Sequence, residues 1–251
     1  MEALSGVDLP RGDGVKTRIP LVLRLREAAA GGEEFAELPQ LGDDDRAPIR
    51  IALDQISAAI EKRTAELAGV GNDIVDTPVE MTVYRKDQDD LTLIDLPGMT
   101  RVAVGGQHQD IEATITKMYR RYIAPEETIV LNVVSAMVDI STSKALQLSR
   151  ELDPSGQRTL LCITKVDQHT EPGLPDKITA ASRQLGLPMP QIFCVRNRSQ
   201  QENEHAVPLA QVRAAEAEFF RSRGEFAGLP PGVKGTGSLS KHLVRLQVRL
   251  G

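Results

Sequence analysis

The stretch LTLIDLPG at residues 91–98 decides the fold class. Apolar and β-branched residues run into Asp95 and then into a Pro-Gly turn, which predicts a buried parallel strand ending at the aspartate. In open α/β sheets, ligands bind at the carboxyl ends of the strands. An aspartate there, three residues before Gly98, can hold Mg²⁺ through water while the glycine N–H faces a terminal phosphate. The alternative is an apolar strand that ends in an ordinary turn, because Asp-x-x-Gly is a short pattern.

A second apolar stretch, TLLCITKVD at residues 159–167, also ends in polar residues. The Asp167 carboxylate can accept both the ring N–H and the exocyclic amine of guanine, while the Lys165 stem lies along the base. Adenine presents a different edge and would pair badly with that carboxylate. A surface loop with a lysine and an aspartate is the alternative. Because two strand-end motifs occur in this order, about 70 residues apart, we expect a GTP site.

The composition predicts one soluble α/β domain. The chain has 251 residues, 41% of them hydrophobic and 26% charged, and a formal net charge of −5. Neither a membrane span of about 18 apolar residues nor a signal peptide is expected. Mild acidity and an aromatic content of only 3% argue against nucleic acid as a partner. Cys162 and Cys194 lie in apolar runs, which predicts reduced core thiols in a cytoplasmic protein.

The polar loop at residues 7–20 contains Gly14-Val15-Lys16-Thr17, which superficially suggests a phosphate-binding P-loop. A P-loop needs Gly-x₄-Gly-Lys-Ser/Thr between a strand and a helix, and this stretch meets neither condition. Thr17 has a different possible role, because a threonine in a loop before a strand can reach Mg²⁺ and the attacking water when a γ-phosphate is present. The alternative is a solvated loop threonine.

The remaining periodicities place strands and helices alternately along the chain. We expect further strands at residues 19–25, 79–84, 128–134 and 191–195, and helices at 54–67, 110–122, 141–152, 176–185, 207–220 and 239–250. Residues 26–48 read as a surface connection. The short spacing between 79–84 and 91–98 predicts that these two strands form an antiparallel hairpin. Asn197 follows the 191–195 strand, where it either supports the base or ribose or belongs to a polar turn.

Taken together, LPRGDGVKTRIPLVLRL, LTLIDLPGMTRV, TKVD and VRNRSQ resemble the GTPase domain of dynamin-like large GTPases. The sequence is more similar to the Mx-like and plant dynamin-related branch than to endocytic dynamins. The resemblance implies a P-loop-NTPase-type α/β fold with a mixed, mostly parallel central sheet flanked by helices. It also implies GTP hydrolysis with Mg²⁺ and a homodimer of GTPase domains that forms across the nucleotide, with higher oligomers.

The resemblance assigns roles to nine positions of this sequence. Thr17 would be the switch threonine and would share the metal with Asp95, while Asp95 and Gly98 would serve the γ-phosphate. Four residues would bind the guanine nucleotide: Lys165, Asp167, Asn197 and Arg198. The backbone carbonyls of Gly12 and Gly14 match a loop that, in dynamin, helps to hold a monovalent cation in place of an arginine finger.

One departure from the family concerns the start of the chain. In the family, a strand and the P-loop come directly before the residues that match MEALSG, so we expect weakened nucleotide binding by this chain alone. We expect residues 1–237 to be a truncated GTPase domain and residues 238–251 to begin a helical bundle. The resemblance also implies nucleotide-dependent self-assembly linked to membrane or filament remodelling. Any membrane or microtubule association would involve only regions outside this chain. The alternative is a nucleotide-deficient interaction module or a truncated gene product.

Overall fold

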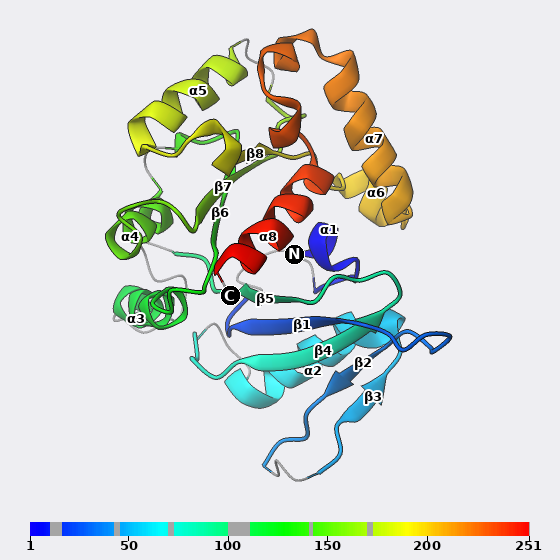
Figure 1. The fold of residues 1–251 in the computed structure, drawn as a ribbon. Helices are drawn as coiled ribbons and strands as arrows, with labels where there is room; N and C mark the ends of the chain where they lie inside the picture. Colours follow the sequence, from blue (N-terminus) through cyan, green and yellow to red (C-terminus); the bar gives the residue numbers. More distant parts are fainter. Residues whose placement is uncertain are drawn as a thin grey trace. The chain divides into compact units, whose positions relative to one another are not determined.

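The computed structural model describes residues 1–10, 17–42, 46–69, 73–99, 111–140, 143–169 and 173–250. The chain divides into two compact units, Met1–Arg120 and Arg121–Gly251. Each unit has its own sheet, its own helices and its own apolar core (Figure 1). The α/β class expected from the sequence is confirmed. The expected boundary after residue 237 stays a prediction.

The first unit contains a five-stranded mixed sheet in the order β3-β2-β4-β1-β5. Its strands are β1 (Leu21–Glu27), β2 (Phe35–Leu38), β3 (Ile49–Ile51), β4 (Val79–Arg85) and β5 (Leu91–Asp95). Strand β1 pairs in parallel with β4, and the other pairings in this sheet are antiparallel. Strand β2 lies within residues 26–48, the stretch that the sequence predicted to be a surface connection. Strand β3 directly follows that stretch.

The hairpin predicted between β4 and β5 is wrong, because β1 lies between them. Val22 pairs with Glu80 of β4 on one side and with Ile94 of β5 on the other. Adjacent strands lie about 4.8 Å apart, so the short turn between β4 and β5 easily spans one intervening strand. Strand β5 was expected to be a parallel strand, but its described neighbour β1 runs antiparallel to it. Asp95 is still its last residue, as predicted.

One face of this sheet is more deeply buried than the other. Alternate residues of β4, Val79, Met81 and Val83, are buried, as expected for a sheet with one covered face. Helix α2 (Ile56–Ala68) covers that face with Ile56 and Ile60, which belong to the same apolar cluster. A short helix α1 (Glu2–Ser5) precedes the sheet, and α3 (Ile111–Ile123) follows it in the chain.

The second unit contains a three-stranded parallel sheet in the order β6-β7-β8. Its strands are β6 (Val130–Ser135), β7 (Thr159–Thr164) and β8 (Ile192–Cys194). The central strand β7 is buried almost throughout, which explains its nearly continuous apolar sequence. Because the strands are parallel and in register, Ser135, Thr164 and Cys194 end at the same edge of the sheet.

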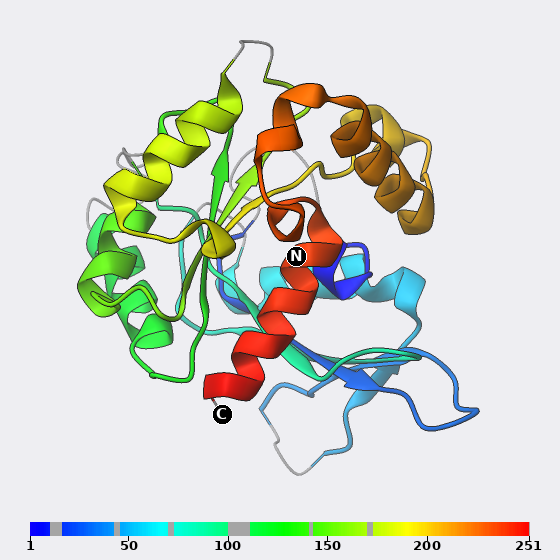
Figure 2. The same ribbon diagram turned by 45° about the horizontal axis from the view of Figure 1, so that its top comes forward.

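Helices cover both faces of the parallel sheet (Figure 2). They are α4 (Lys144–Leu152), α5 (Leu174–Leu185), α6 (Gln200–Glu204), α7 (Leu209–Ser222) and α8 (Thr236–Leu250), with short 3₁₀ turns at Met189–Gln191, Gly224–Gly228 and Pro231–Val233. Helix α4 packs on the face that carries Asn132, which accepts a hydrogen bond from Ser149. Helix α8 packs on the opposite face, where the ring of His242 meets Phe193 at 5.2 Å between centroids.

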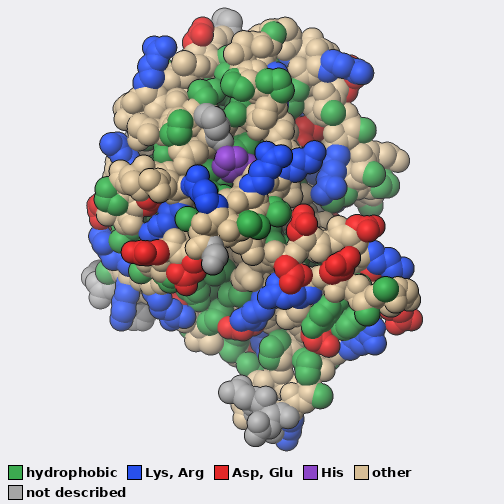
Figure 3. Space-filling model, in the orientation of Figure 1, with side chains coloured by type: hydrophobic (Ala, Val, Ile, Leu, Met, Phe, Trp, Pro, Cys, Tyr) green, Lys and Arg blue, Asp and Glu red, His purple; other side chains and the backbone are tan. Residues whose placement is uncertain are grey.

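Helix α8 is amphipathic, as its leucine spacing predicts. Leu239, Leu243 and Leu246 are buried, whereas Lys241 and Arg245 are exposed. Figure 3 shows basic side chains gathered on the drawn face over the region of α8. None of the described helices is both long enough and apolar enough to cross a bilayer.

The two cysteines are free and buried, as predicted. Burial raises the pKa of each thiol to about 12, so both are protonated at neutral pH. They therefore serve as small apolar core residues of the parallel sheet.

Candidate functional site

The first unit brings together two residues that the sequence analysis singled out. The Thr17 hydroxyl donates a hydrogen bond to Oδ2 of Asp95 at 3.3 Å. Strand β5 positions the carboxylate at its carboxyl end, and the segment leading into β1 positions the hydroxyl. The antiparallel pairing of these strands, with Leu21 opposite Asp95, explains why the loop before β1 reaches the end of β5.

The Asp95 carboxyl lies in surroundings that disfavour its charge. Burial raises the pKa of Asp95 above the ordinary value of 3.8, and this effect outweighs the amino group of Met1 and the Thr17 hydroxyl, which both lower it. A partly buried carboxylate with a raised pKa gains more than an exposed one when a cation binds beside it. Such groups are concentrated at functional sites.

A cavity of about 340 Å³ opens beside this pair. Its lining combines apolar and polar side chains: Leu9, Pro10, Thr17, Arg18, Ile19, Leu21, Ile60, Glu61, Thr64, Val79 and Asp95. The sequence analysis missed Arg18, although it directly follows Thr17. Its Nη2 donates to the Gly69 carbonyl at 2.9 Å, and its Nη1 is buried without a hydrogen-bond partner among the described residues. A buried guanidinium nitrogen of this kind favours an anionic ligand nearby.

The turn after Asp95 is anchored by a tyrosine from α3. The Tyr119 hydroxyl donates to the Pro97 carbonyl at 3.2 Å. Burial and the charge of Asp95 raise the pKa of Tyr119 to about 12, so the phenol keeps its proton and remains a donor. Gly98 is exposed, with open space where a Cβ would lie. The turn is therefore held at Pro97 and accessible at Gly98.

The second unit places Lys165 and Asp167 in a turn at the end of β7. The Lys165 carbonyl accepts a hydrogen bond from the Gln168 N–H at 3.1 Å, and Val166 between them is buried. Lys165 has a φ of 57°, in the left-handed region. That conformation costs a residue with a side chain about 1–2 kcal/mol. Such strain is frequent at functional positions, and among the described residues Asp87 and Ala206 share it.

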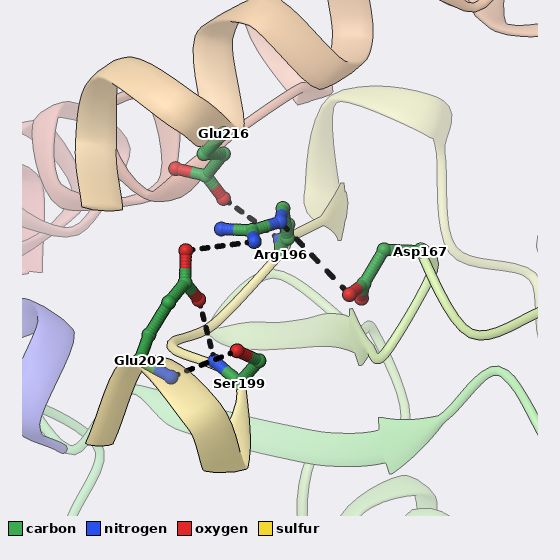
Figure 4. Close-up of polar contacts among 5 residues, drawn as sticks. All are labelled: Asp167, Arg196, Ser199, Glu202 and Glu216. Carbon is green, nitrogen blue, oxygen red and sulfur yellow. Dashed lines mark hydrogen bonds and ion pairs between the residues drawn. The ribbon is translucent and has the colours of Figure 1, made fainter. Parts of the chain in front are cut away.

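Asp167 lies next to an arginine that comes from the end of β8. Arg196 Nε lies 3.9 Å from Asp167 Oδ2, and both side chains are mostly buried, with exposed fractions of 16% and 22% (Figure 4). The Arg196 Nη2 donates to Glu202 Oε1 at 2.9 Å. The sequence analysis did not single out Arg196. The segments that follow β7 and β8 therefore meet, as parallel strands in register require.

A buried glutamate of α7 fixes the segment that follows β8. Glu216, only 4% exposed, accepts the Arg196 N–H at 2.8 Å and the Thr236 N–H at 2.8 Å. The Thr236 hydroxyl donates to the same carboxylate at 3.2 Å. One acidic side chain thereby ties the end of β8 to the start of α8.

The remaining predicted site residues are Asn197, Arg198, Gly12 and Gly14. Asn197 follows Arg196 and is exposed, and Arg198 is half-buried. Both therefore lie in the same segment as the arginine that meets Asp167. Gly12 and Gly14, the predicted monovalent-cation residues, lie outside the described residues.

The oxygen atoms of Thr17 and Asp95 suit a hard divalent cation. A hydroxyl and a carboxylate are oxygen ligands of the kind that Mg²⁺ prefers, and this ion usually keeps several waters and binds through few protein groups. Within the described ranges, no group of three or more His, Cys, Asp or Glu residues forms an all-protein metal cage. The pair of Thr17 and Asp95 therefore fits Mg²⁺ completed by water and phosphate oxygens.

Comparison with known proteins gives consistent similarities. Residues 1–166 match the family described as "Dynamin family". "Putative dynamin-related protein 4A" of Arabidopsis thaliana is 40% identical over 222 residues, covering 88% of this chain and 69% of that protein. "Dynamin-related protein 4C" of the same plant is 36% identical over 247 residues, covering 98% and 35%. "Interferon-induced GTP-binding protein Mx1" of Bos taurus is 39% identical over 237 residues, covering 94% and 36%.

These similarities confirm the resemblance found in the sequence motifs. The chain spans 69% of the first relative and about a third of the length of the other two. A solved structure from work on an oligomerised bacterial dynamin pair aligns with a TM-score of 0.44 and 10% identity, over 99% of this chain and 33% of that chain.

Proposed function

The chain belongs to the dynamin family, and we propose that it forms a domain that binds GTP and hydrolyses it with Mg²⁺. The main support is the hydrogen bond from Thr17 to Asp95 beside a cavity that Arg18 also lines. An oxygen pair next to a guanidinium is suited to a metal–phosphate ligand, because the carboxylate attracts the cation and the arginine attracts the anion.

In this proposal, Thr17 and Asp95 hold Mg²⁺ at the phosphate end of the nucleotide. When bound, the ion supplies positive charge that stabilises negative charge on the phosphate oxygens. The Gly98 N–H is available to a terminal phosphate oxygen because the position is exposed. Tyr119 holds the turn through the Pro97 carbonyl and so limits the movement of Gly98. Phosphoryl transfer depends mainly on such positioning and electrostatic stabilisation.

The guanine base is assigned to the turn after β7. The Asp167 carboxylate accepts the ring N–H and the exocyclic amine, and the Lys165 stem lies along the base. A site built to bond both donors rejects bases that lack them, because its carboxylate would then be left unpaired. Asn197 and Arg198 supply further polar contacts to the base or ribose.

Three parts of the proposal rest on the family alone. The first is a monovalent cation held by the carbonyls of Gly12 and Gly14. The second is a homodimer of GTPase domains and larger assemblies. The third is a link between self-assembly and the remodelling of membranes or filaments.

The experiment measures binding of GTP, ATP and XTP to the protein that carries this chain, with and without Mg²⁺. We expect Mg²⁺-dependent GTP binding and release of inorganic phosphate. Asp167→Asn replaces one acceptor oxygen with a donor, so it should change the GTP-to-XTP affinity ratio by about a hundredfold or more in favour of xanthine. Equal affinity for GTP and ATP, or an unchanged ratio in Asp167→Asn, would contradict the proposal.

A further inference from the structure

We propose that Arg196 is a positioning residue that orients the Asp167 carboxylate for recognition of the base. This inference rests on the proposed function, because it assumes that Asp167 reads guanine. It adds a specificity-determining residue that acts through Asp167. The basis is the arrangement of charges in Figure 4, where Arg196 lies between Asp167 and Glu202.

The distances show that Arg196 restrains Asp167 without using its acceptors. The separation of 3.9 Å between Arg196 Nε and Asp167 Oδ2 is an ion pair, but it exceeds the 2.7–3.2 Å typical of an N–H···O hydrogen bond. Both carboxylate oxygens therefore keep lone pairs for the two N–H donors of guanine.

Arg196 is held at two further points, one on its guanidinium and one on its backbone. Its Nη2 donates to Glu202 Oε1 at 2.9 Å, and the backbone N–H of Arg196 donates to Glu216 at 2.8 Å. The bond to Glu202 is the shorter side-chain contact, so the arginine is anchored on the α6 side and reaches toward Asp167 from there.

Glu202 is fixed in turn by the start of helix α6. Its Oε2 accepts the Ser199 N–H at 2.7 Å, and the Ser199 hydroxyl accepts the Glu202 N–H at 3.2 Å. This reciprocal pair is a capping box, which locks both residues at the helix N-terminus. The order of restraint therefore runs from Ser199 through Glu202 and Arg196 to Asp167.

The test compares nucleotide selectivity in three variants of the protein that carries this chain. Arg196→Met removes the charge but keeps much of the side-chain volume. We expect it to weaken GTP binding about tenfold while XTP binding stays nearly constant, because the xanthine complex does not depend on an oriented carboxylate. Arg196→Lys, which keeps the charge, should restore part of the loss. Glu202→Gln, which can still form the capping box, should give a smaller loss of the same kind.

The matched control is Glu204→Gln on the same helix. Glu204 is exposed and accepts a hydrogen bond from Gln200 rather than from Arg196. It should leave both affinities unchanged. Thermal unfolding of every variant identifies any general loss of structure.

A double-mutant cycle separates positioning from a purely structural role. If Arg196 acts through Asp167, Arg196→Met should not alter the GTP-to-XTP ratio further once Asp167→Asn is present. Equal weakening of GTP and XTP by Arg196→Met would overturn the inference and indicate a structural role. If Asp167→Asn changes selectivity but Arg196→Met does not, the inference fails while the proposed function stands. If Asp167→Asn changes nothing, the proposed function itself fails.

Discussion

Thr17 donates a hydrogen bond to Asp95, although the two residues lie 78 positions apart in the sequence. The bond joins the loop before β1 to the end of β5, the two elements that the antiparallel pairing of these strands brings together. It places a hydroxyl and a partly buried carboxylate in the lining of one cavity. Both groups offer oxygen atoms, the kind of ligand that Mg²⁺ prefers.

Asp95→Asn should abolish most activity while stabilising the fold. The amide keeps the shape but removes the charge, so Mg²⁺-dependent GTP hydrolysis should fall about a hundredfold. Because burial raises the pKa of this carboxyl, its ionisation costs stability as the pH rises through that pKa, and the variant escapes this cost at pH 7. Steady-state hydrolysis and thermal unfolding measure the two effects. Asp90→Asn, at an exposed position outside the cavity, is the control and should change neither.

Lys165→Gly should weaken GTP binding and stabilise the fold. Glycine accepts the left-handed backbone at this position without strain but adds freedom to the unfolded chain, so we expect a net gain of about 0.5–1 kcal/mol in unfolding free energy. GTP binding should weaken because the side-chain stem is lost. Denaturant unfolding and nucleotide titration report the two quantities.

The control for Lys165→Gly is Ala206→Gly, which relieves the same kind of strain at a φ of 47°. It should give a similar gain in stability with unchanged GTP binding. Equal binding by both variants would remove Lys165 from the base site.

Glu216→Gln should destabilise the second unit. The carboxylate accepts the backbone N–H groups of Arg196 and Thr236, and an amide in its place turns one acceptor into a donor that faces a donor. An unsatisfied buried group costs about 1–3 kcal/mol, so the unfolding free energy should fall by about 2 kcal/mol. Glu218→Gln, two residues along the same helix and 54% exposed, should cost far less. Equal losses in denaturant unfolding would contradict the assigned role of Glu216.

Asp153→Asn should reveal a pH-dependent contribution to stability. Burial raises the pKa of Asp153, but hydrogen bonds from Thr159, Ser155 and the Arg158 N–H outweigh it and hold the pKa below 3.8. A carboxyl with a lowered pKa stabilises the fold above its ordinary pKa and loses that contribution as the pH falls through the folded-state value. The variant should therefore be less stable than the parent protein at pH 7, by about 1–3 kcal/mol, with a smaller difference below about pH 4.

Chemical unfolding at a series of pH values measures this difference. Asp89→Asn, in an exposed turn, should show no such pH dependence. A constant difference between the parent protein and Asp153→Asn across the series would count against the assigned hydrogen bonds.

Local patterns predicted most helices and strands of this protein. The leucine spacing of α8 identified the residues that pack inward, and the apolar run before Lys165 identified β7. These predictions succeeded because period and turn chemistry act over a few neighbouring residues. The pattern failed at β2, which is only four residues long and follows a stretch rich in alanine and glycine.

The sequence by itself placed Asp95 at the end of one strand and Asp167 just after another. Only the tertiary structure decided that β1 separates β4 from β5, that Arg18 lines the cavity beside Thr17, and that Arg196 lies against Asp167. The physical reason is the separation along the chain over which each kind of interaction acts. Turn propensity and side-chain alternation depend on neighbours in the chain, whereas strand order and side-chain partners depend on the free energy of contacts between distant segments.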